Sequence, residues 1–429
     1  MDSIEVRTLR PIEKDCEFGY IDSEGKIVIA PQFDDADDFY EGLARVEIEG
    51  KWGYINNMGE YVIEPQFDYA DIFCEGLARV RVGCTTDFYE NKMGGKWGFI
   101  DKTGQFVIEP KFASVDNFSE GLALVVEESK IDKNIENSFD DDDADDIYED
   151  LACVQIGLDT DSQEDNIGRM CGFIDKTGQY VIEPQFDQAS GFSEGLAAVS
   201  KEFKHGYIDK TGKIVIELQF GHADKFHDGL AVVSVEEKDS PDKYGYIDKN
   251  GKFVIKPQFI QAEDFSEDLA AVSMINKDGY LMWGFINKTG KFVIEPQYDS
   301  VEIFSDGLAK VLVGEEGDGG KWGYINKTGN MVIPPQFDNA SDFSDGLACV
   351  NIGCALDEDL KFCYVGGKWG YIDKTGKFVI EPQFDAAEDF IDGLAYVNVG
   401  CVVDPRRGEY VGGEWGFIDK TGQFLKISE

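Results

Sequence analysis

The sequence predicts an all-β protein built from tandem repeats of about 40 residues. The block KWGYINKTGNMVIPPQFDNASDFSDGLACV at 321–350 recurs with few changes at 368–397 and at 51–80. Each copy contains short apolar runs separated by turn residues, a pattern typical of strands joined by tight turns. A glycine that precedes a central aromatic residue recurs from Gly19 to Gly416. Self-similarity at this spacing indicates a solenoid or a propeller.

The first half of each copy predicts a β-hairpin. In WGFIDKTGQFVIEP (97–110), two apolar runs flank a turn that opens on Asp101 and closes on Gly104. An Asp or Asn that opens such a turn bonds nearby backbone amides, and the glycine supplies a left-handed residue. Proline, as at Pro110, is expected to end the second strand.

The second half predicts a bend, a second tight turn and another strand. The FDxAxxF segment is too short for a stable helix, so we expect a strand or an extended bend. The turn that follows, for example 119–123, has Asp150 or Asp268 in place of its glycine in two copies. Glycine and aspartate both tolerate positive φ, so a left-handed residue is expected there. With the LAxV strand, each copy has about four short strands.

The copies account for almost the whole chain. The distance from Gly98 to Gly172 is nearly twice the usual spacing, and FDDDDADDIYEDLACV at 139–154 keeps a second half. We therefore expect ten tandem repeats over 18–413, with one decayed copy at about 127–157. An N-terminal strand or cap at 1–17 and a C-terminal half-repeat cap at 414–429 flank them.

The number of copies bears on the overall architecture. Propellers usually have four to eight blades. Ten copies favour an open, curved superhelix of β-hairpin units. The alternative is a closed, propeller-like ring, in which an N-terminal strand from 3–9 completes the last unit.

All six tryptophans occupy one slot, immediately before the repeated glycine: Trp52, Trp97, Trp283, Trp322, Trp369 and Trp415. We expect these side chains to form a structural core between successive units. The repeated Trp-Gly pair resembles the WG-repeat family of bacterial proteins over residues 18–427. That resemblance implies a β-rich tandem-repeat protein of bacterial origin. It implies no general enzymatic activity and no shared catalytic residues.

Charge and composition exclude several classes of partner. Lys and Arg total 40 and Asp and Glu total 84, so the net charge is −44. A chain this acidic is a poor match for nucleic acid or for anionic membrane surfaces. The first residues lack the basic and apolar regions of a signal peptide, and the nine cysteines form no CxxC pair. We expect a cytoplasmic protein with no membrane association.

Candidate catalytic and metal-binding residues are few. His205 occupies the tryptophan slot, and His222 and His227 lack the spacing of zinc ligands. The sequence contains no GxSxG motif and no GxxxxGK[ST] phosphate loop, so we expect no cofactor and no metal. Calcium would suit the acidic run at 140–146, yet this run lacks the spaced pattern of an EF-hand loop. A solvated surface bend is the simpler reading.

These features predict a non-enzymatic scaffold that binds a protein or peptide. A carbohydrate-binding or carboxylate-based hydrolytic module is the alternative. The recognition edge is expected at 84–93, 354–365 and 401–411, which are long connections between an LAxV strand and the next WG strand. Aromatic residues and Arg are enriched at binding hot spots, and these loops contain Phe88, Tyr89, Phe362, Tyr364, Arg406, Arg407 and Tyr410. The opposing interpretation is that the long hairpins only extend their sheets.

Overall fold

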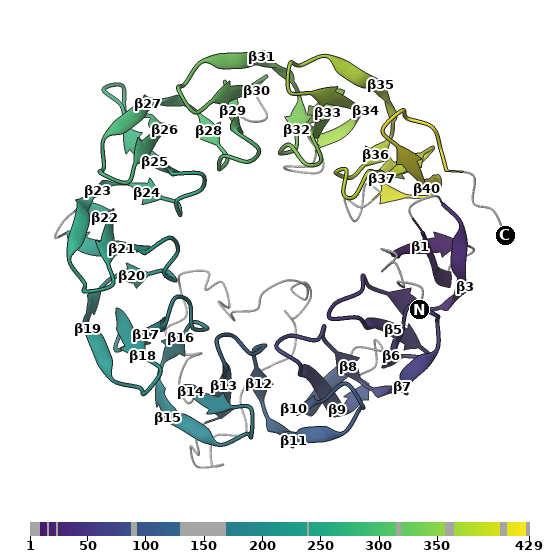
Figure 1. Ribbon diagram of the computed structural model, residues 1–429. Helices are drawn as coiled ribbons and strands as arrows, with labels where there is room; N and C mark the ends of the chain where they lie inside the picture. The colour runs from purple at the N-terminus through teal and green to yellow at the C-terminus, as the bar shows by residue number, and fades with distance from the viewer. Residues whose placement is uncertain are drawn as a thin grey trace, which may run out of the picture. The chain divides into compact units, whose positions relative to one another are not determined.

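The computed structural model describes residues 9–14, 17–22, 25–86, 92–128, 169–237, 240–314, 319–356, 364–403 and 410–425. All regular secondary structure in these ranges is β-strand, which confirms the all-β tandem-repeat class (Figure 1). The chain divides into two compact units. The first unit contains Met1–Gln32, Glu236–Ile247 and Phe253–Glu429, and the second contains Phe33–Val235 and Asp248–Lys252.

One sheet recurs throughout, with four antiparallel strands in chain order. Its pattern is β4 (Asp35–Ala36), β5 (Ala44–Ile48), β6 (Lys51–Ile55) and β7 (Tyr61–Phe67). The FDxA segment forms the two-residue strand, the LAxV and WG segments form the middle strands, and a seven-residue strand follows. Each sheet therefore combines the second half of one copy with the first half of the next, and it has the strand order of a propeller blade.

The second unit continues with the same pattern. Its further strands are β8 (Tyr69–Ala70), β9 (Ala78–Thr86), β10 (Lys92–Ile100), β11 (Phe106–Phe112), β12 (Ser114–Val115), β13 (Leu122–Glu128), β14 (Arg169–Asp175), β15 (Tyr180–Phe186), β16 (Gln188–Ala189), β17 (Leu196–Lys201), β18 (Lys204–Asp209), β19 (Ile214–Phe220) and β20 (His222–Ala223). Strand β21 (Leu230–Glu237) follows, and its last two residues belong to the first unit, as do most of β22 (Ser240–Asp248) and all of β23 (Phe253–Phe259).

The first unit contains the remaining strands. They are β1 (Arg10–Lys14), β2 (Glu17–Ile21), β3 (Ile27–Phe33), β24 (Gln261–Ala262), β25 (Leu269–Ile275), β26 (Leu281–Asn287), β27 (Phe292–Tyr298), β28 (Ser300–Val301), β29 (Leu308–Val313), β30 (Lys321–Asn326), β31 (Met331–Phe337), β32 (Asn339–Ala340), β33 (Leu347–Leu356), β34 (Tyr364–Asp373), β35 (Phe378–Phe384), β36 (Ala386–Ala387), β37 (Leu394–Val399), β38 (Val402–Val403), β39 (Tyr410–Val411) and β40 (Glu414–Asp419).

The glycine of the WG pair lies where two backbones cross closely. A Cβ atom added at Gly53 would lie 2.6 Å from the carbonyl oxygen of Ile63 and 2.6 Å from the nitrogen of Pro65. The ladder between β6 and β7 shifts register at this point. Pro65 therefore lies inside the seven-residue strand, so the expectation that proline ends this strand is wrong. An outermost strand tolerates proline at a bulge, because the amide hydrogen that proline lacks would not bond to a neighbouring strand there.

The first hairpin turn is confirmed in detail. Asp101 Oδ1 accepts hydrogen bonds from the amides of Thr103, at 2.8 Å, and Gln105, at 3.2 Å. Gly104 closes the turn with a φ of +82°.

The second turn contains two left-handed residues. Glu41 has a φ of 49° and Gly42 a φ of 88°, and Tyr40 and Leu43 exchange backbone hydrogen bonds across them. The left-handed residue expected at Asp268 is confirmed by a φ of 72°. Asp150 lies outside the described residues. The left-handed glutamate is a feature that the sequence reading missed.

The N-terminal sheet packs against the last sheet within the first unit. Ile12 and Ile21 share a buried cluster with Leu394 and Phe417. The Arg10 guanidinium also lies 3.2 Å from a carboxylate oxygen of Asp392. An open array brings no such pair of sheets together, so this contact fits the propeller-like alternative rather than the open superhelix. The segment 3–9, which the alternative assigned to the closing strand, lies outside the described residues apart from Leu9. The first described strand, β1, pairs with β2 of its own sheet.

The decayed copy expected at about 127–157 lies mostly outside the described residues. The strands on either side of it pair directly, since Glu128 of β13 lies opposite Arg169 of β14. Among the described residues there is no helix with the length and hydropathy that a membrane crossing requires.

Candidate recognition face

The two ends of each sheet differ in chemistry. At the end with the two tight turns, Lys102 Nζ contacts the backbone oxygen of Glu41 at 2.7 Å and its carboxylate at 3.0 Å. The Gly76 amide donates to the same carboxylate. The hydrogen bond from Lys102 lowers the pKa of Glu41. This clasp joins a turn of one sheet to both turns of the next, so its charged groups serve the scaffold.

The clasp recurs along both units. Its further lysine–carboxylate pairs are Lys176–Glu75, Lys210–Glu120, Lys249–Glu194, Lys327–Glu267, Lys374–Asp306 and Lys420–Asp345.

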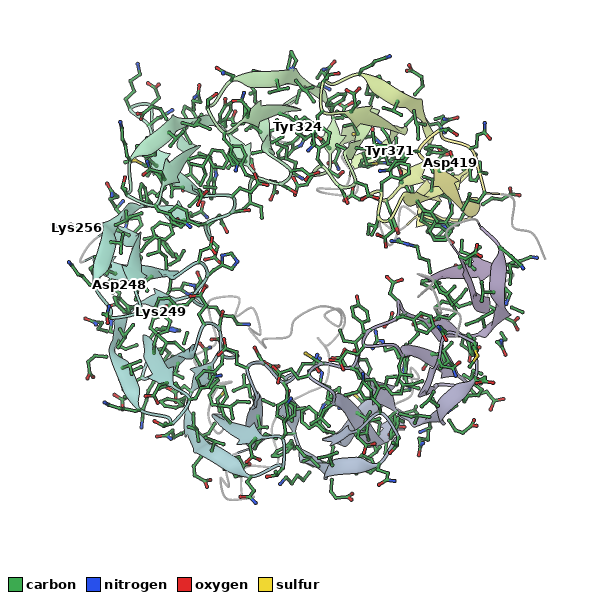
Figure 2. The ribbon with its side chains drawn as sticks, viewed as in Figure 1. Asp248, Lys249, Lys256, Tyr324, Tyr371 and Asp419 are labelled. Atoms are coloured by element: carbon green, nitrogen blue, oxygen red, sulfur yellow. The ribbon has the colours of Figure 1, made fainter. Side chains whose placement is uncertain are left out.

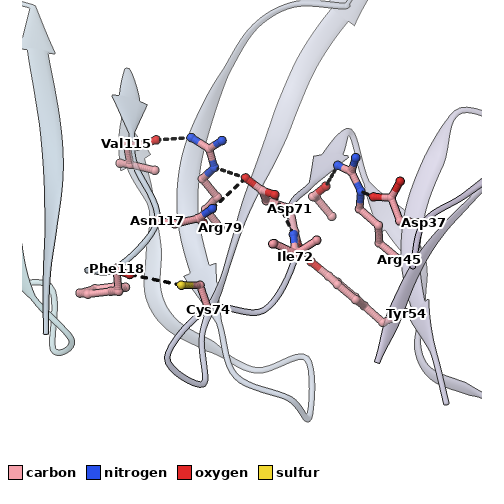
Figure 3. Close-up of polar contacts among 11 residues, drawn as sticks. Asp37, Arg45, Tyr54, Asp71, Ile72, Cys74, Arg79, Val115, Asn117 and Phe118 are labelled. Atoms are coloured by element: carbon pink, nitrogen blue, oxygen red, sulfur yellow. Dashed lines mark hydrogen bonds and ion pairs between the residues drawn. The ribbon is translucent and has the colours of Figure 1, made fainter. Parts of the chain in front are cut away.

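Two arginines of the second unit join neighbouring sheets in the same way (Figure 3). Arg45 pairs with Asp37 and donates to the Ala70 carbonyl at 2.7 Å. Arg79 pairs with Asp71 at 2.6 Å and donates to the next sheet at Val115. Their guanidinium groups also lie over indole rings, Arg45 at 4.6 Å from the Trp52 centroid. These cations hold the scaffold together and are not offered to a ligand.

The tryptophan slot is buried to different degrees. Trp52 and Trp322 are buried, while Trp97, Trp283 and Trp369 are partly buried against the cores of their sheets. Trp415 is 37% exposed and stacks on Tyr396, with ring centroids 4.9 Å apart. Five of the six tryptophans therefore lie in or against the buried clusters, and Trp415 departs from this pattern. Their role as a core between successive units stays a prediction.

The histidines lie close together in the second unit. His205, in the tryptophan slot, is beside His222, with ring centroids 5.9 Å apart. Burial lowers the pKa of His205, whereas the hydrogen bond with Asp224 raises that of His222. His227 forms an isolated bridge with Leu230. No group of His, Cys, Asp and Glu side chains suited to a metal ion occurs in the described part of the chain.

Three carboxyl groups after the two-residue strands have raised pKa values. Burial raises the pKa of Asp116, Asp342 and Glu388, and neighbouring Arg79 and Lys310 oppose the shift at the first two. They lie in three different sheets. No sequence signal singles them out, because most copies have an acidic residue at this place.

Tyrosine hydroxyls hold this same segment in place. Tyr324 donates to the Ser341 carbonyl and Tyr371 to the Glu388 carbonyl, each at 2.7 Å; Figure 2 labels both tyrosines. The tyrosine hydroxyls thus hold the segment through its backbone carbonyl groups.

The opposite end of each sheet carries the hairpin tips between LAxV and WG strands. In the first unit, consecutive sheets expose apolar side chains at or near this end, which we call the tip row: Ile275, Tyr280, Leu281, Val313, Ile352, Val399 and Val402. Tyr280 is 62% exposed and Val402 is 64% exposed. Ser266, Ser305 and Ser344 each donate to a backbone carbonyl of the next sheet. Because these sheets are neighbours with one strand order, their tips lie at one end.

An aspartate anchors several of the tips. Asp338 Oδ2 accepts the Gly353 amide at 2.6 Å, and the other oxygen pairs with Lys321. Asp68 holds Cys84 in the same way. Where both are present, the FD aspartate and the KWG lysine fix the base of the tip, whereas Gly221 and Ile260 occupy the aspartate position in two other copies.

Most of the predicted binding residues lie outside the described residues, namely Phe88, Tyr89, Phe362, Arg406 and Arg407. The backbones of Tyr364 and Tyr410 lie in β34 and β39, and their side chains are not described.

The long connections do begin at the tip end, as expected. Their first parts extend the sheets, because the β9–β10 ladder reaches Thr86 and Lys92 and the β33–β34 ladder reaches Leu356 and Tyr364. In the third connection, β38 and β39 form a small separate ladder. The interpretation that the long hairpins extend their sheets therefore holds for these described parts, and the recognition edge stays a prediction.

Comparison with known structures gives only distant likenesses. The acylaminoacyl peptidase of Pyrococcus horikoshii is 12% identical with a TM-score of 0.32, covering 92% of this chain and 58% of the peptidase. A prolyl endopeptidase is 8% identical with a TM-score of 0.34, covering 86% of this chain and 55% of that chain. The WD40 β-propeller domain of Doa1 is 11% identical with a TM-score of 0.25, covering 53% of this chain and 82% of that chain. At these scores no activity is inferred from them.

Comparison of sequences is more informative. No curated protein matches the chain. The sequence profile of the WG containing repeat matches residues 18–52, 52–83, 97–130, 172–202, 206–238, 244–277, 283–316, 322–353 and 369–400. These matches cover well over half of the chain and coincide with the strands described above, so the protein belongs to the WG containing repeat family.

Proposed function

We propose that this protein is a non-catalytic scaffold that binds a protein or peptide through the tip row of its first unit. The observation that carries the proposal is the row itself, in which consecutive sheets expose apolar side chains at one end. A contiguous apolar patch rimmed by polar residues is typical of interaction sites. At the turn end of the described sheets, lysines and carboxylates engage one another, and Ile391 is the exposed apolar residue beside the Asp345–Lys420 pair.

The chemistry around the row suggests the kind of partner. The chain has a net charge of −44, so a segment with apolar residues flanked by basic ones would be attracted to it. The described cysteines are free, which agrees with action in a reducing compartment such as the bacterial cytoplasm. The carbohydrate-binding alternative retains one favourable observation, the half-exposed Trp415 ring, because indole faces stack on sugars.

The test compares substitutions in the tip row with substitutions of exposed apolar residues elsewhere in the first unit. One set changes the tip row with Tyr280→Ser, Leu281→Ser and Val402→Ser. The control changes Val293→Ser and Val379→Ser, which are exposed on the outer strands β27 and β35. Each chain is used to capture proteins from a lysate of the source cells, and an array of oligosaccharides is probed in parallel.

We expect the wild type and the control to capture the same protein, and the tip-row variant to lose it while its melting temperature stays unchanged. Equal capture by all three chains, or no specific capture by the wild type, would contradict the proposal. Binding of an oligosaccharide that Trp415→Ala abolishes would favour the alternative.

A further inference from the structure

Three of the described sheets place a cation over the indole ring of their own tryptophan. The cation is the residue between the alanine and the valine of the LAxV segment: Arg45, Arg79 or Lys310. The Arg45 guanidinium lies 4.6 Å from the centroid of Trp52 and pairs with Asp37, which follows the two-residue strand. The negative face of an indole attracts a cation. The indole and the acidic residue thus form a cation site that the chain itself fills.

The last sheet, formed by β36, β37 and β40, has the indole and the acidic residue, but Tyr396 stands at the position of the cation. The backbone shows this correspondence, because the Glu388 amide donates to the Tyr396 carbonyl at 2.9 Å. The same hydrogen bond joins Asp37 to Arg45 at 3.2 Å. The uncharged Tyr396 ring stacks on Trp415, which is 37% exposed.

The Tyr396–Trp415 pair faces the N-terminal sheet. Phe417 lies beside Tyr396, with ring centroids 4.8 Å apart, and shares a buried cluster with residues of β1 and β2. Alternate residues of a strand point to the same face, so Trp415 and Phe417 of β40 lie on one side of the sheet. Val397 belongs to the cluster on the other side, and Val399 of the tip row alternates with it. The pair is therefore distinct from the tip row.

The polar groups around this pair are electronegative. The Tyr396 hydroxyl oxygen is buried and has no hydrogen-bond partner among the described residues. Burial and then the charges of Glu13 and Glu388 raise the pKa of Tyr396 to about 12. In the described part of the chain neither of these carboxylates forms an ion pair, and Arg10 of β1 is engaged with Asp392. A buried hydroxyl without a partner is costly, and unpaired carboxylates attract a cation.

We propose that the junction between the N-terminal sheet and the last sheet binds the guanidinium group of an arginine side chain. The guanidinium stacks on the exposed part of the Trp415 ring, in the role that Arg45 has in its own sheet. Glu13 and Glu388 pair with its charge, and Tyr396 Oη accepts one of its N–H groups. Arginine suits this place better than lysine, because its planar group stacks on aromatic rings and presents several donors.

The probe is N-acetyl-arginine amide. N-acetyl-citrulline amide is the matched control, because a neutral urea group replaces the guanidinium. Binding to the full chain is followed through the indole N–H signals in two-dimensional NMR spectra, and Trp415→Phe identifies the signal of Trp415. We expect the arginine compound to shift this signal saturably and to leave that of the buried Trp322 unchanged. The citrulline compound should bind about tenfold more weakly or worse, because it lacks the charge.

Three variants test the roles of the residues. Tyr396→Arg supplies an internal guanidinium, so it should abolish binding of the probe while the melting temperature stays equal or rises. Glu13→Gln with Glu388→Gln should weaken binding about tenfold. Glu295→Gln, at an exposed position on β27, should leave it unchanged.

The tip-row variant should bind the probe normally, so failure of this site and failure of the proposed function can be told apart. The proposal is overturned if the probe gives no saturable shift at millimolar concentrations, if the citrulline compound binds equally well, or if the double glutamate variant binds as the wild type does. A Trp415 signal that moves with an oligosaccharide and not with the arginine compound would overturn it in favour of the carbohydrate-binding alternative.

Discussion

The glycine after the tryptophan slot shows how one residue fixes the geometry of a sheet. At Gly323, an added Cβ would lie 2.6 Å from the Ile333 oxygen and 2.7 Å from the Pro335 nitrogen, and both are backbone atoms. Backbone cannot move aside as a flexible side chain can. The crossing of β30 and β31 therefore exists only with glycine at this position.

We expect Gly323→Ala to lower the free energy of unfolding by about 3 kcal/mol, the upper range for overpacking. Gly346→Ala is the matched control, because Gly346 has a φ of +81° with open space around it. Its expected loss is about 1–2 kcal/mol, from left-handed strain alone. Urea denaturation measures both, and a larger loss for the control would contradict the close crossing.

The tryptophan slot provides a second residue-scale prediction. Trp322→Ala should cost about 3–5 kcal/mol, because a buried indole leaves a cavity. Trp415→Ala should cost clearly less, since Trp415 is 37% exposed. The measurement is the urea midpoint of each variant, with acrylamide quenching to compare indole exposure. Equal losses at the two positions would show that the exposure of the indole does not determine how much it contributes to stability.

Sequence alone predicted the residues that act locally and missed those that act across space. The Asp101 and Gly104 turn was predictable because its hydrogen bonds span a few residues. The left-handed Glu41 was not, because what favours it is a contact with Lys102 of the next sheet. The place of Pro65 within β7 was likewise hidden, since it depends on a bulge opposite Gly53.

At the scale of the element, the first hairpin turn couples stability to pH. Hydrogen bonds to the carboxylate lower the pKa of the turn aspartates Asp101, Asp175, Asp209, Asp248, Asp373 and Asp419. A carboxyl with a lower pKa in the folded state stabilises the fold above its unfolded pKa. That contribution is lost as the pH falls through the folded pKa. The same slot holds Asn56, Asn287 and Asn326, which do not titrate.

Changing the six turn aspartates to Asn should keep the turns and remove their titration. Between about pH 5 and about pH 3, we expect the melting temperature of this variant to fall less than that of the wild type. Asp116, Asp342 and Glu388, whose raised pKa values have the opposite sign, are unchanged in both chains and cancel in the comparison. Identical acid profiles of the two chains would show that the turns contribute no pH dependence.

The hairpin tips mark the limit of prediction for the site. Variable loop length at one slot correctly indicated which end of the sheets would project. It could not indicate the tip row, because the exposure of side chains such as Val313 and Ile352 depends on how the folded sheets pack.

At the scale of the whole molecule, the net charge of −44 dominates the electrostatics. Like charges repel in the compact state, and added salt screens that repulsion over about 10 Å at 0.1 M. Added salt also weakens the attraction within the lysine–carboxylate clasps, which lowers stability. Each exposed ion pair contributes little to the free energy of unfolding, however.

We therefore expect the melting temperature to rise as NaCl is increased from low concentration to about 0.1–0.2 M. Potassium chloride at the same ionic strength is the control for ion-specific effects. A melting temperature that falls steadily with NaCl would show that the clasps outweigh the net charge. A rise with calcium that sodium does not produce would instead indicate binding at the acidic run 140–146.

The way the chain passes from sheet to sheet has a consequence for how the protein can evolve. A sheet such as β4–β7 is one uninterrupted stretch, and only Asp68 separates it from β8. A duplication or deletion of one such stretch in the gene would add or remove a whole sheet, and no surviving strand would need a new partner. Lineages can therefore change their number of sheets by recombination between copies, without passing through an unfolded ancestor.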